Sequence, residues 1–112
     1  MSSVRQDKVA ALIKREMAVI FQQYGNDLFK GSLITVTQAR VSPDLGVARL
    51  YISIFPPAKR VEAMESIQHH TSQLRKYLGE RVGKQLRKIP ELTFFMDDSL
   101  DYSDEIDKLL KG

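Results

Sequence analysis

The chain has 112 residues, of which 43% are hydrophobic and 28% charged, and this composition predicts one globular domain over residues 1–112. It lacks cysteine and any long apolar run, which excludes disulfides, thiolate metal sites, cysteine nucleophiles and membrane-spanning helices, so we expect a cytoplasmic protein. The net charge of +3 is segregated: residues 97–112 carry six acids and two lysines, whereas the other 96 residues carry 15 Lys or Arg and eight acids. Such segregation favours a polyanionic partner.

The first predicted element is a helix over residues 3–24. Its apolar residues recur at three- and four-residue spacing, while Lys8, Arg15 and Gln22 fall on the opposite face. The apolar stripe consists of Val9, Ile13, Met17, Ile20 and Tyr24. We expect this stripe to face the core.

Two strands are predicted next, over residues 33–41 and 47–55. Both segments are rich in β-branched or aromatic residues, and the segment between them contains Pro43-Asp44 followed by Gly46, which favours a turn. The strands are therefore expected to form a hairpin. In the second strand, the face opposite the apolar one carries Arg49, Tyr51 and Ser53.

A pair of helices is expected after Pro56-Pro57. The first begins near Ala58, and its buried side is marked by Val61, Met64 and Ile67. The second spans Leu74–Lys88 and ends before Pro90, because a residue that precedes proline disfavours helix. Its apolar stripe consists of Leu74, Leu78, Val82, Leu86 and Ile89.

A short strand over residues 92–96 and a weak acidic helix over the last residues complete the predicted order, which is α-β-β-α-α-β-α. This is an α+β fold, in which helices cover one face of a three-stranded sheet. It is also the order of a type II KH-like RNA-binding domain (α-β-β-α-α-β) with a short C-terminal helix. Topology alone does not fix a function.

The second helix of the pair is unusually basic. Six Lys or Arg residues lie between Arg75 and Lys88, with Glu80 as the only acid, so the ion pairs of an ordinary solvated helix face are missing. A phosphate backbone would relieve the repulsion between these charges. Arg40 and Arg49 lie on the two hairpin strands. They either extend this basic surface from the helix to the sheet edge or are ordinary charges at the rim of the domain. The candidate RNA-binding residues are Arg40, Arg49, Arg75, Lys76, Arg81, Lys84, Arg87 and Lys88.

Two glycines in the same helix, Gly79 and Gly83, each lower helix stability by about 1 kcal/mol relative to alanine. One explanation is the close approach of a phosphate backbone. The other is close packing against a neighbouring helix, or a kink. The sequence leaves both open.

Residues that suggest other chemistry have simpler explanations. His69 and His70 are adjacent, so their side chains point about 100° apart on a helix and serve a metal poorly. Asp97, Asp98 and Asp101 are expected to cap the final helix. Phosphate-binding loops, a nucleophile elbow and HExxH are absent. We therefore expect no enzyme activity, metal or cofactor.

Four stretches in a consistent order carry a resemblance to a known family. They are the opening helix from Arg5 to Ile20, the hairpin segments 34–37, 41–45 and 48–53, the pairs Leu74-Arg75, Leu78-Gly79 and Leu86-Arg87, and the segment 90–95 followed by 97–100. Together they resemble the bacterial ribosome-binding factor A family over nearly the whole chain.

The resemblance implies a KH-like, non-catalytic factor that binds 16S ribosomal RNA in free 30S subunits. We expect a monomer, because nothing in the sequence demands more. It also implies a role in late subunit maturation and precursor rRNA processing, notably in the cold. The family's Ala-x-Gly kink is replaced here by His70-Thr71-Ser72, so the helix junction is either straighter or kinked by side-chain hydrogen bonds. The long charged C-terminal tail of some family members is not expected here either. The alternative function is a protein–protein adaptor that uses the acidic C-terminal helix or the sheet edge.

Overall fold

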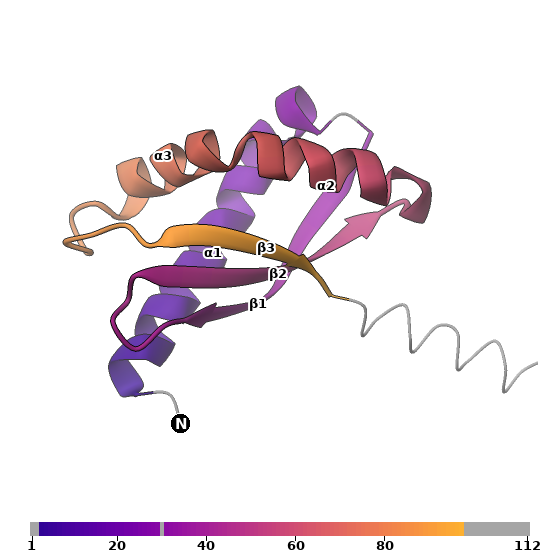
Figure 1. Cartoon of the computed structure of the whole chain (residues 1–112). Helices are drawn as coiled ribbons and strands as arrows, with labels where there is room; N and C mark the ends of the chain where they lie inside the picture. The colour runs from indigo at the N-terminus through magenta and orange to yellow at the C-terminus, as the bar shows by residue number, and fades with distance from the viewer. Residues whose placement is uncertain (1–2, 30, 98–112) are drawn as a thin grey trace, which may run out of the picture.

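The fold is mixed α+β, and it is seen in a computed structural model that describes residues 3–29 and 31–97 (Figure 1). The elements in chain order are α1 (Val4–Leu28), β1 (Leu33–Val41), β2 (Val47–Phe55), the 3-10 helix η1 (Pro57–Lys59), α2 (Arg60–His69), α3 (Thr71–Val82) and β3 (Glu91–Met96). The predicted order is confirmed through β3 and is consistent with a KH-like fold. The predicted final helix lies outside the described residues.

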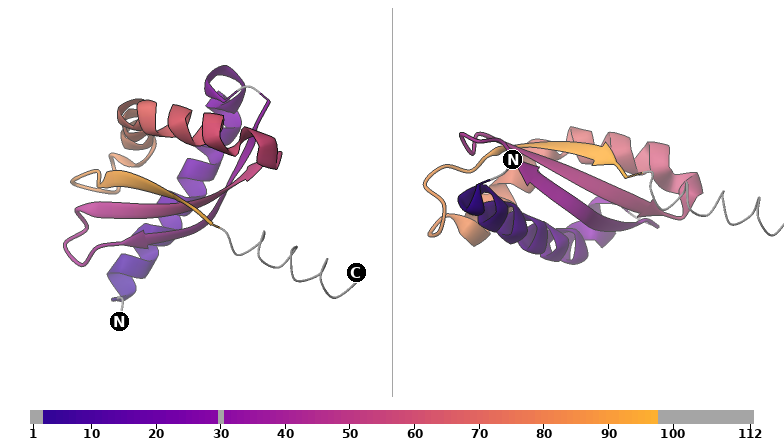
Figure 2. Two further views of the ribbon diagram at one scale, coloured as in Figure 1. Left: turned by 45° about the vertical axis from the view of Figure 1, so that its right-hand side comes forward. Right: turned by 90° about the horizontal axis from the view of Figure 1, so that it is seen from below.

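The three strands form one sheet in the order β1-β2-β3, with β1 antiparallel and β3 parallel to β2. Helix α1 crosses behind this sheet, and α2 and α3 run end to end alongside β3 (Figures 1 and 2). The buried side chains of all three helices meet the same face of the sheet. No described helix covers the other face, on which Arg49 lies.

Apolar periodicity accounts for the core. Ser3 caps α1 through a reciprocal pair of bonds with Gln6, and the predicted stripe of α1 is buried from Val9 to Ile20. The helix continues past its predicted end at Tyr24, where that ring stacks on Tyr77 of α3 at 4.0 Å. The alternate residues of β2 that face the helices are also buried, namely Ala48, Leu50, Ile52 and Ile54.

The buried side of α2 differs from the prediction. Val61 is 70% exposed, and Met64 is only partly buried. Ala63 and Ile67, which are four residues apart and therefore share one face of α2, are buried instead. The prediction that Val61 marks the buried side was therefore wrong.

The helix junction is a single residue, His70, between α2 and α3. Thr71 donates its hydroxyl hydrogen bond to the Ile67 carbonyl at 2.9 Å, and the His70 ring nitrogen lies 2.8 Å from the Ser66 carbonyl oxygen. His70 has φ −103° and ψ 16°, outside the regular helical values. Side-chain hydrogen bonds thus accompany the kink, which was one of the two expected arrangements.

Helix α3 ends earlier than predicted, at Val82 rather than Lys88. A Cβ added to Gly83 would lie 2.6 Å from the Gly79 carbonyl oxygen, and the Ile89 side chain lies over Gly79. The chain after Val82 turns back, so that Ile89 packs on the helix and Pro90 is buried. The backbone turn at the end of α3 therefore accounts for Gly83, whereas Gly79 leaves room for an ordinary contact with Ile89. It also places Lys84, Arg87 and Lys88 in a loop over residues 83–90 rather than on a helix.

Asp44 organises the turn between β1 and β2, as predicted. Its carboxylate accepts from the Ser42 hydroxyl at 2.6 Å and from the Gly46 amide at 3.0 Å, and the Ser42 oxygen in turn accepts from the Val47 amide. These two hydrogen bonds, first from Ser42 and then from Gly46, lower the pKa of Asp44. The ionised carboxylate is thus the form that the turn requires.

We expect Asp44→Val to lower the melting temperature without weakening RNA binding, because valine cannot accept these bonds. Since the folded pKa is lowered, the contribution of Asp44 is present above its ordinary pKa of 3.8 and is lost as pH falls through the lowered value. Asp44→Asn is the control, because asparagine retains an acceptor for the turn. Melting curves and RNA affinity measured together decide the matter. A normal melting temperature with weakened binding for Asp44→Val would show that Asp44 serves the RNA instead.

Candidate nucleic-acid interface

The eight candidate RNA-binding residues do not form one continuous track. Lys84, Arg87 and Lys88 lie in the loop after α3, and Lys76 is exposed on α3 itself. Arg75 and Arg81 have their guanidinium groups engaged within the protein. Arg40 and Arg49 lie on the face of the sheet that is opposite the helices. The sequence had placed the other six on one helix and left Arg40 and Arg49, on the hairpin strands, as either an extension of that surface or rim charges.

The loop after α3 forms the most basic part of the described chain. Arg87 and Lys88 line a hollow of about 340 Å³ together with Arg5 of α1, and Lys84 is exposed in the same loop. We call these four residues the basic end. Asp44 is the acid that lines this hollow, and its carboxylate is already engaged in the hairpin turn. After the Ser42 and Gly46 hydrogen bonds, the charge of Lys88 also acts on Asp44 and helps to lower its pKa, whereas Arg5, Lys84 and Arg87 are exposed to an anionic partner.

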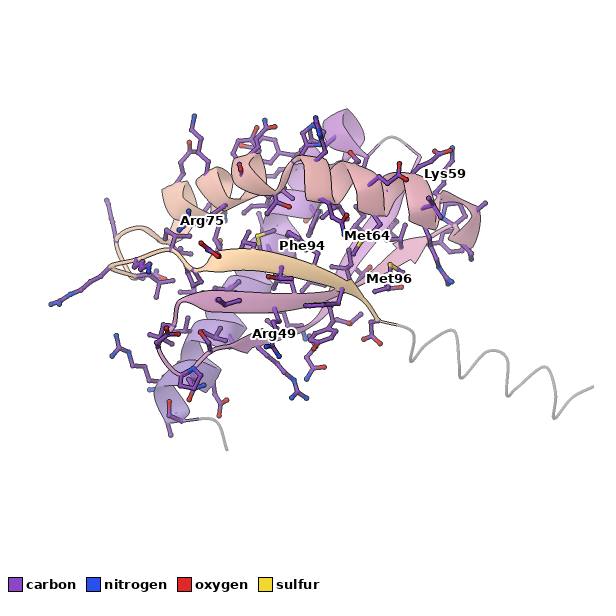
Figure 3. The ribbon with its side chains drawn as sticks, viewed as in Figure 1. Arg49, Lys59, Met64, Arg75, Phe94 and Met96 are labelled. Carbon is purple, nitrogen blue, oxygen red and sulfur yellow. The ribbon has the colours of Figure 1, made fainter. Side chains whose placement is uncertain are left out.

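Arg75 fixes the loop that carries these cations. Its Nε donates to the Pro90 carbonyl at 3.1 Å, and a terminal nitrogen donates to the Ile89 carbonyl at 2.6 Å. A planar guanidinium fork suits two neighbouring carbonyls, whereas a lysine ammonium is a single point of donation. Figure 3 shows Arg75 between α3 and β3. Its position favours a role in holding the loop over direct contact with RNA.

Arg81 joins α3 to α1. Its Nε lies 2.5 Å from a carboxylate oxygen of Glu16, whose side chain is only 15% exposed. This hydrogen bond is the main reason that the pKa of Glu16 lies below its usual value, and the Arg81 and Arg15 charges act in the same direction. The charge of Arg81 is thus largely matched within the protein.

Lys76 extends the basic end along α3. It lines a shallow hollow with Ser72, Gly79 and Ile89, on the side of the helix against which the loop folds. Positively charged side chains therefore line both this hollow and the hollow of the basic end, and the loop over residues 83–90 contributes to each. An RNA phosphate backbone fits such a region through charge alone.

The groups considered as metal ligands have other partners. The His70 ring bonds to the carbonyl of Ser66 and packs edge-on against Phe29, and Asp97 accepts from the Thr37 hydroxyl. Asp98 and Asp101 lie outside the described residues. Within residues 3–29 and 31–97, no cluster of three or more His, Cys, Asp or Glu residues could hold a metal ion. Among the same residues no helix is both long and apolar enough to cross a membrane.

Comparison with known proteins places the chain in a family. A family model described as ribosome-binding factor A matches residues 5–110. The chain belongs to the ribosome-binding factor A family. Its relative in Cytophaga hutchinsonii, a ribosome-binding factor A, is 48% identical over 110 residues, which cover 98% of this chain and 83% of the relative. The family resemblance seen in the sequence is thereby confirmed.

Solved structures agree with this assignment. The crystal structure of ribosome-binding factor A from Thermus thermophilus is 27% identical, with a TM-score of 0.68, and the match covers 81% of this chain and 94% of that one. A homology model of the Thermus thermophilus factor, fitted into a cryo-EM map of its 30S complex, is 28% identical, with a TM-score of 0.59 and coverages of 80% and 91%. The chain thus shares the fold of these family members.

Arg5 is the residue of this surface that sequence interpretation missed in this family member. It lies in the first turn of α1, far along the chain from the loop at residues 83–90. No local pattern relates the two segments, because the fold alone brings the start of α1 beside the loop. The only sequence signal is that the positions three and four residues after Arg5 on the helix, Lys8 and Val9, are not acidic, which is weak.

Proposed function

We propose that this protein is a ribosome assembly factor that binds 16S ribosomal RNA of the small subunit. The observation that carries the proposal is the basic end, where Arg5 lines one hollow with Arg87 and Lys88 from a distant segment of the chain, and Lys84 is exposed in the same loop. Membership of the ribosome-binding factor A family supports it. So does the likeness to the Thermus thermophilus factor that was fitted into a map of a 30S complex.

The mechanism rests on positioning and not on catalysis. Phosphates replace counterions around the basic end, and the release of those counterions provides binding free energy at low and moderate salt. Arg75 keeps the loop in place on α3, so that the cations are presented in a fixed arrangement. A preorganised loop loses less conformational entropy on binding than a free one.

The factor acts on free 30S subunits during late maturation and supports processing of the precursor rRNA, with its largest effect on growth in the cold. It works in the cytoplasm as a monomer, without a cofactor and without an enzymatic step. These finer statements follow the family resemblance, and the basic end supplies the physical means for binding. A protein–protein adaptor remains the competing function that experiment must exclude.

Sedimentation of a cell lysate tests this proposal. We expect the protein to travel with free 30S subunits and to leave them as salt rises, because each phosphate contact steepens the salt dependence. Protein found only with complete ribosomes, or only at the top of the gradient, would contradict the proposal. Salt-insensitive retention on another protein would support the adaptor instead.

A further inference from the structure

The open face of the sheet carries two arginines in direct opposition. Arg40 of β1 and Arg49 of β2 are cross-strand partners in the antiparallel register, and both side chains are exposed. Like charges placed directly opposite each other destabilise a sheet. Figure 3 shows Arg49 projecting from β2 away from the helices. This pair is therefore unfavourable for the fold by itself.

The charge of this pair is not matched by an acid. Neither arginine forms an ion pair with an acid among the residues that the structure describes. The neighbour of Arg40 on the same face is the neutral amide of Gln38, whose oxygen, when turned toward the guanidinium, lies 3.0 Å from Nε. That contact orients Arg40 and leaves its charge in place.

An aromatic pair lies beside the arginines on the same face. Tyr51 follows Arg49 by two residues on β2 and is the register partner of Phe95 on β3. The two rings are stacked, with centroids 5.5 Å apart and an interplanar angle of 27°, and Phe95 is 40% exposed. Thr93, the register partner of Arg49, is exposed next to Phe95 on the same face of β3. Two cations and an accessible aromatic surface thus adjoin on one face.

We propose that this open face is a second RNA contact, which binds an unpaired segment of the RNA. Phosphates lie against Arg40 and Arg49, and an unstacked base lies on the Tyr51–Phe95 pair. Aromatic side chains stack on any base, and a positive groove beside them follows the backbone. The inference rests on the proposed function, and it adds to it the kind of RNA that is bound: a single strand, held on a face separate from the basic end.

The hairpin turn connects the two contacts. A hollow of about 720 Å³ lined by Arg40 and Arg49 also includes Ser42 and Pro43 of the turn, whereas the hollow of the basic end includes Asp44 and Leu45. Both hollows therefore adjoin the same turn, and the larger one lies at the edge of β1, where Gln6, Asp7 and Ala10 of α1 also line it. An RNA strand that passes the tip of the hairpin reaches both.

Charge argues for RNA over a protein at this face. Three acids border this face: Asp7 of α1 lines the larger hollow, Glu91 precedes Thr93 by two residues on β3, and Asp97 follows Phe95 by two residues and accepts from the Thr37 hydroxyl. None of them is the register partner of Arg40 or Arg49, whose partners are each other and Thr93. A polyanion relieves the repulsion of the arginine pair directly, whereas an apolar protein surface would have to desolvate both charges.

Binding of a single-stranded oligoadenylate of about 12 nucleotides provides the test, since single-strand sites span roughly 4–16 nucleotides. Arg40→Gln with Arg49→Gln removes the cations. Arg40→Lys with Arg49→Lys retains the charge. Phe95→Leu removes an aromatic ring and keeps an apolar side chain. Lys14→Gln with Lys59→Gln is the matched control, because it removes the same charge from exposed or half-exposed sites outside both contacts. Melting curves confirm that each variant is folded.

We expect the Arg→Gln pair to weaken oligoadenylate binding and to flatten the log–log salt slope by about 1.4, at roughly 0.7 per single-strand contact. Phe95→Leu should weaken binding roughly fivefold or more with an unchanged slope, because a stacked base is lost and no charge is. Binding of an RNA duplex should be unaffected by Phe95→Leu. The Arg→Lys pair should retain the slope.

Several outcomes would overturn the inference. One is a folded Arg→Gln pair that binds oligoadenylate as tightly as the Lys14 and Lys59 control. Another is a folded Phe95→Leu protein with normal oligoadenylate affinity. A third is a dimer in sedimentation that these substitutions disrupt while oligoadenylate binding is unchanged, since the face would then bind a second copy. If the 30S subunit is still bound in these cases, the proposed function stands and only the sheet contact is wrong. If the wild-type protein binds neither, the proposed function itself fails.

Discussion

Replacing Arg75 by glutamine is expected to lower both the stability of the fold and the affinity for 30S subunits, even if Arg75 never touches RNA. The substitution removes the donors that bind the Ile89 and Pro90 carbonyls, which are 2.6 and 3.1 Å from the guanidinium. Loss of hydrogen bonds from a charged, partly buried donor should cost about 2 kcal/mol of unfolding free energy. The loop over residues 83–90 then leaves α3, and its cations lose their arrangement. Urea unfolding and binding to 30S subunits measure the two effects.

Two further variants separate the structural role of Arg75 from its charge. Arg75→Lys keeps the charge but lacks the planar fork, so it should lose most of the stability that Arg75→Gln loses. Lys76→Gln removes the same charge from the next, exposed position, and its unfolding free energy should be unchanged. A different result would show that Arg75 binds a phosphate directly and that the account of the loop is wrong. In that case Arg75→Gln is as stable as the wild type, and the log–log salt slope of binding decreases by the amount expected for one phosphate contact.

Local pattern was sufficient for the strands and the first helix. Residues 33–41 and 47–55 form β1 and β2 with the predicted bounds, because β-branched and aromatic side chains alternate there and Pro43-Asp44 with Gly46 fixes the turn. The stripe of α1 is buried as its spacing predicts. In these segments each residue's neighbours along the chain decide its conformation, so periodicity and turn chemistry carry the information.

The basic surface was less predictable, since it depends on contacts between distant residues. Leu86 and Ile89 continue the apolar stripe of α3, so the pattern predicts a longer helix. The helix nevertheless ends at Val82, where Arg75 binds the Ile89 carbonyl and Ile89 packs on Gly79. Arg81 bonds to Glu16 of another helix. Arg40 and Arg49 face away from the helices. A helical wheel drawn from the sequence contains none of these tertiary contacts.

Neutralising Lys84 and Arg87 together should produce the largest loss of binding for two substitutions at exposed sites. Both side chains are exposed in the loop, and neither contributes to the core, so Lys84→Gln with Arg87→Gln should unfold at the wild-type temperature. Affinity for 30S subunits should fall roughly tenfold or more at about 0.1 M salt, because two phosphate contacts are lost. Lys14→Gln with Lys59→Gln has the same change in net charge and serves as the control. Lys59 lies at the far end of the helix pair from the loop (Figure 3).

The most direct test of the basic end is a salt titration of affinity for purified 30S subunits, performed in parallel on the wild type, the Lys84 and Arg87 variant, and the Lys14 and Lys59 control. We predict that the log–log slope of the first variant is flatter than that of the wild type by about 1.4–1.8, at roughly 0.7–0.9 per contact. The control should have the wild-type slope and nearly the wild-type affinity. Equal losses of slope and affinity in the two variants would mean that only net charge matters, and the assignment of RNA contact to the basic end would be wrong.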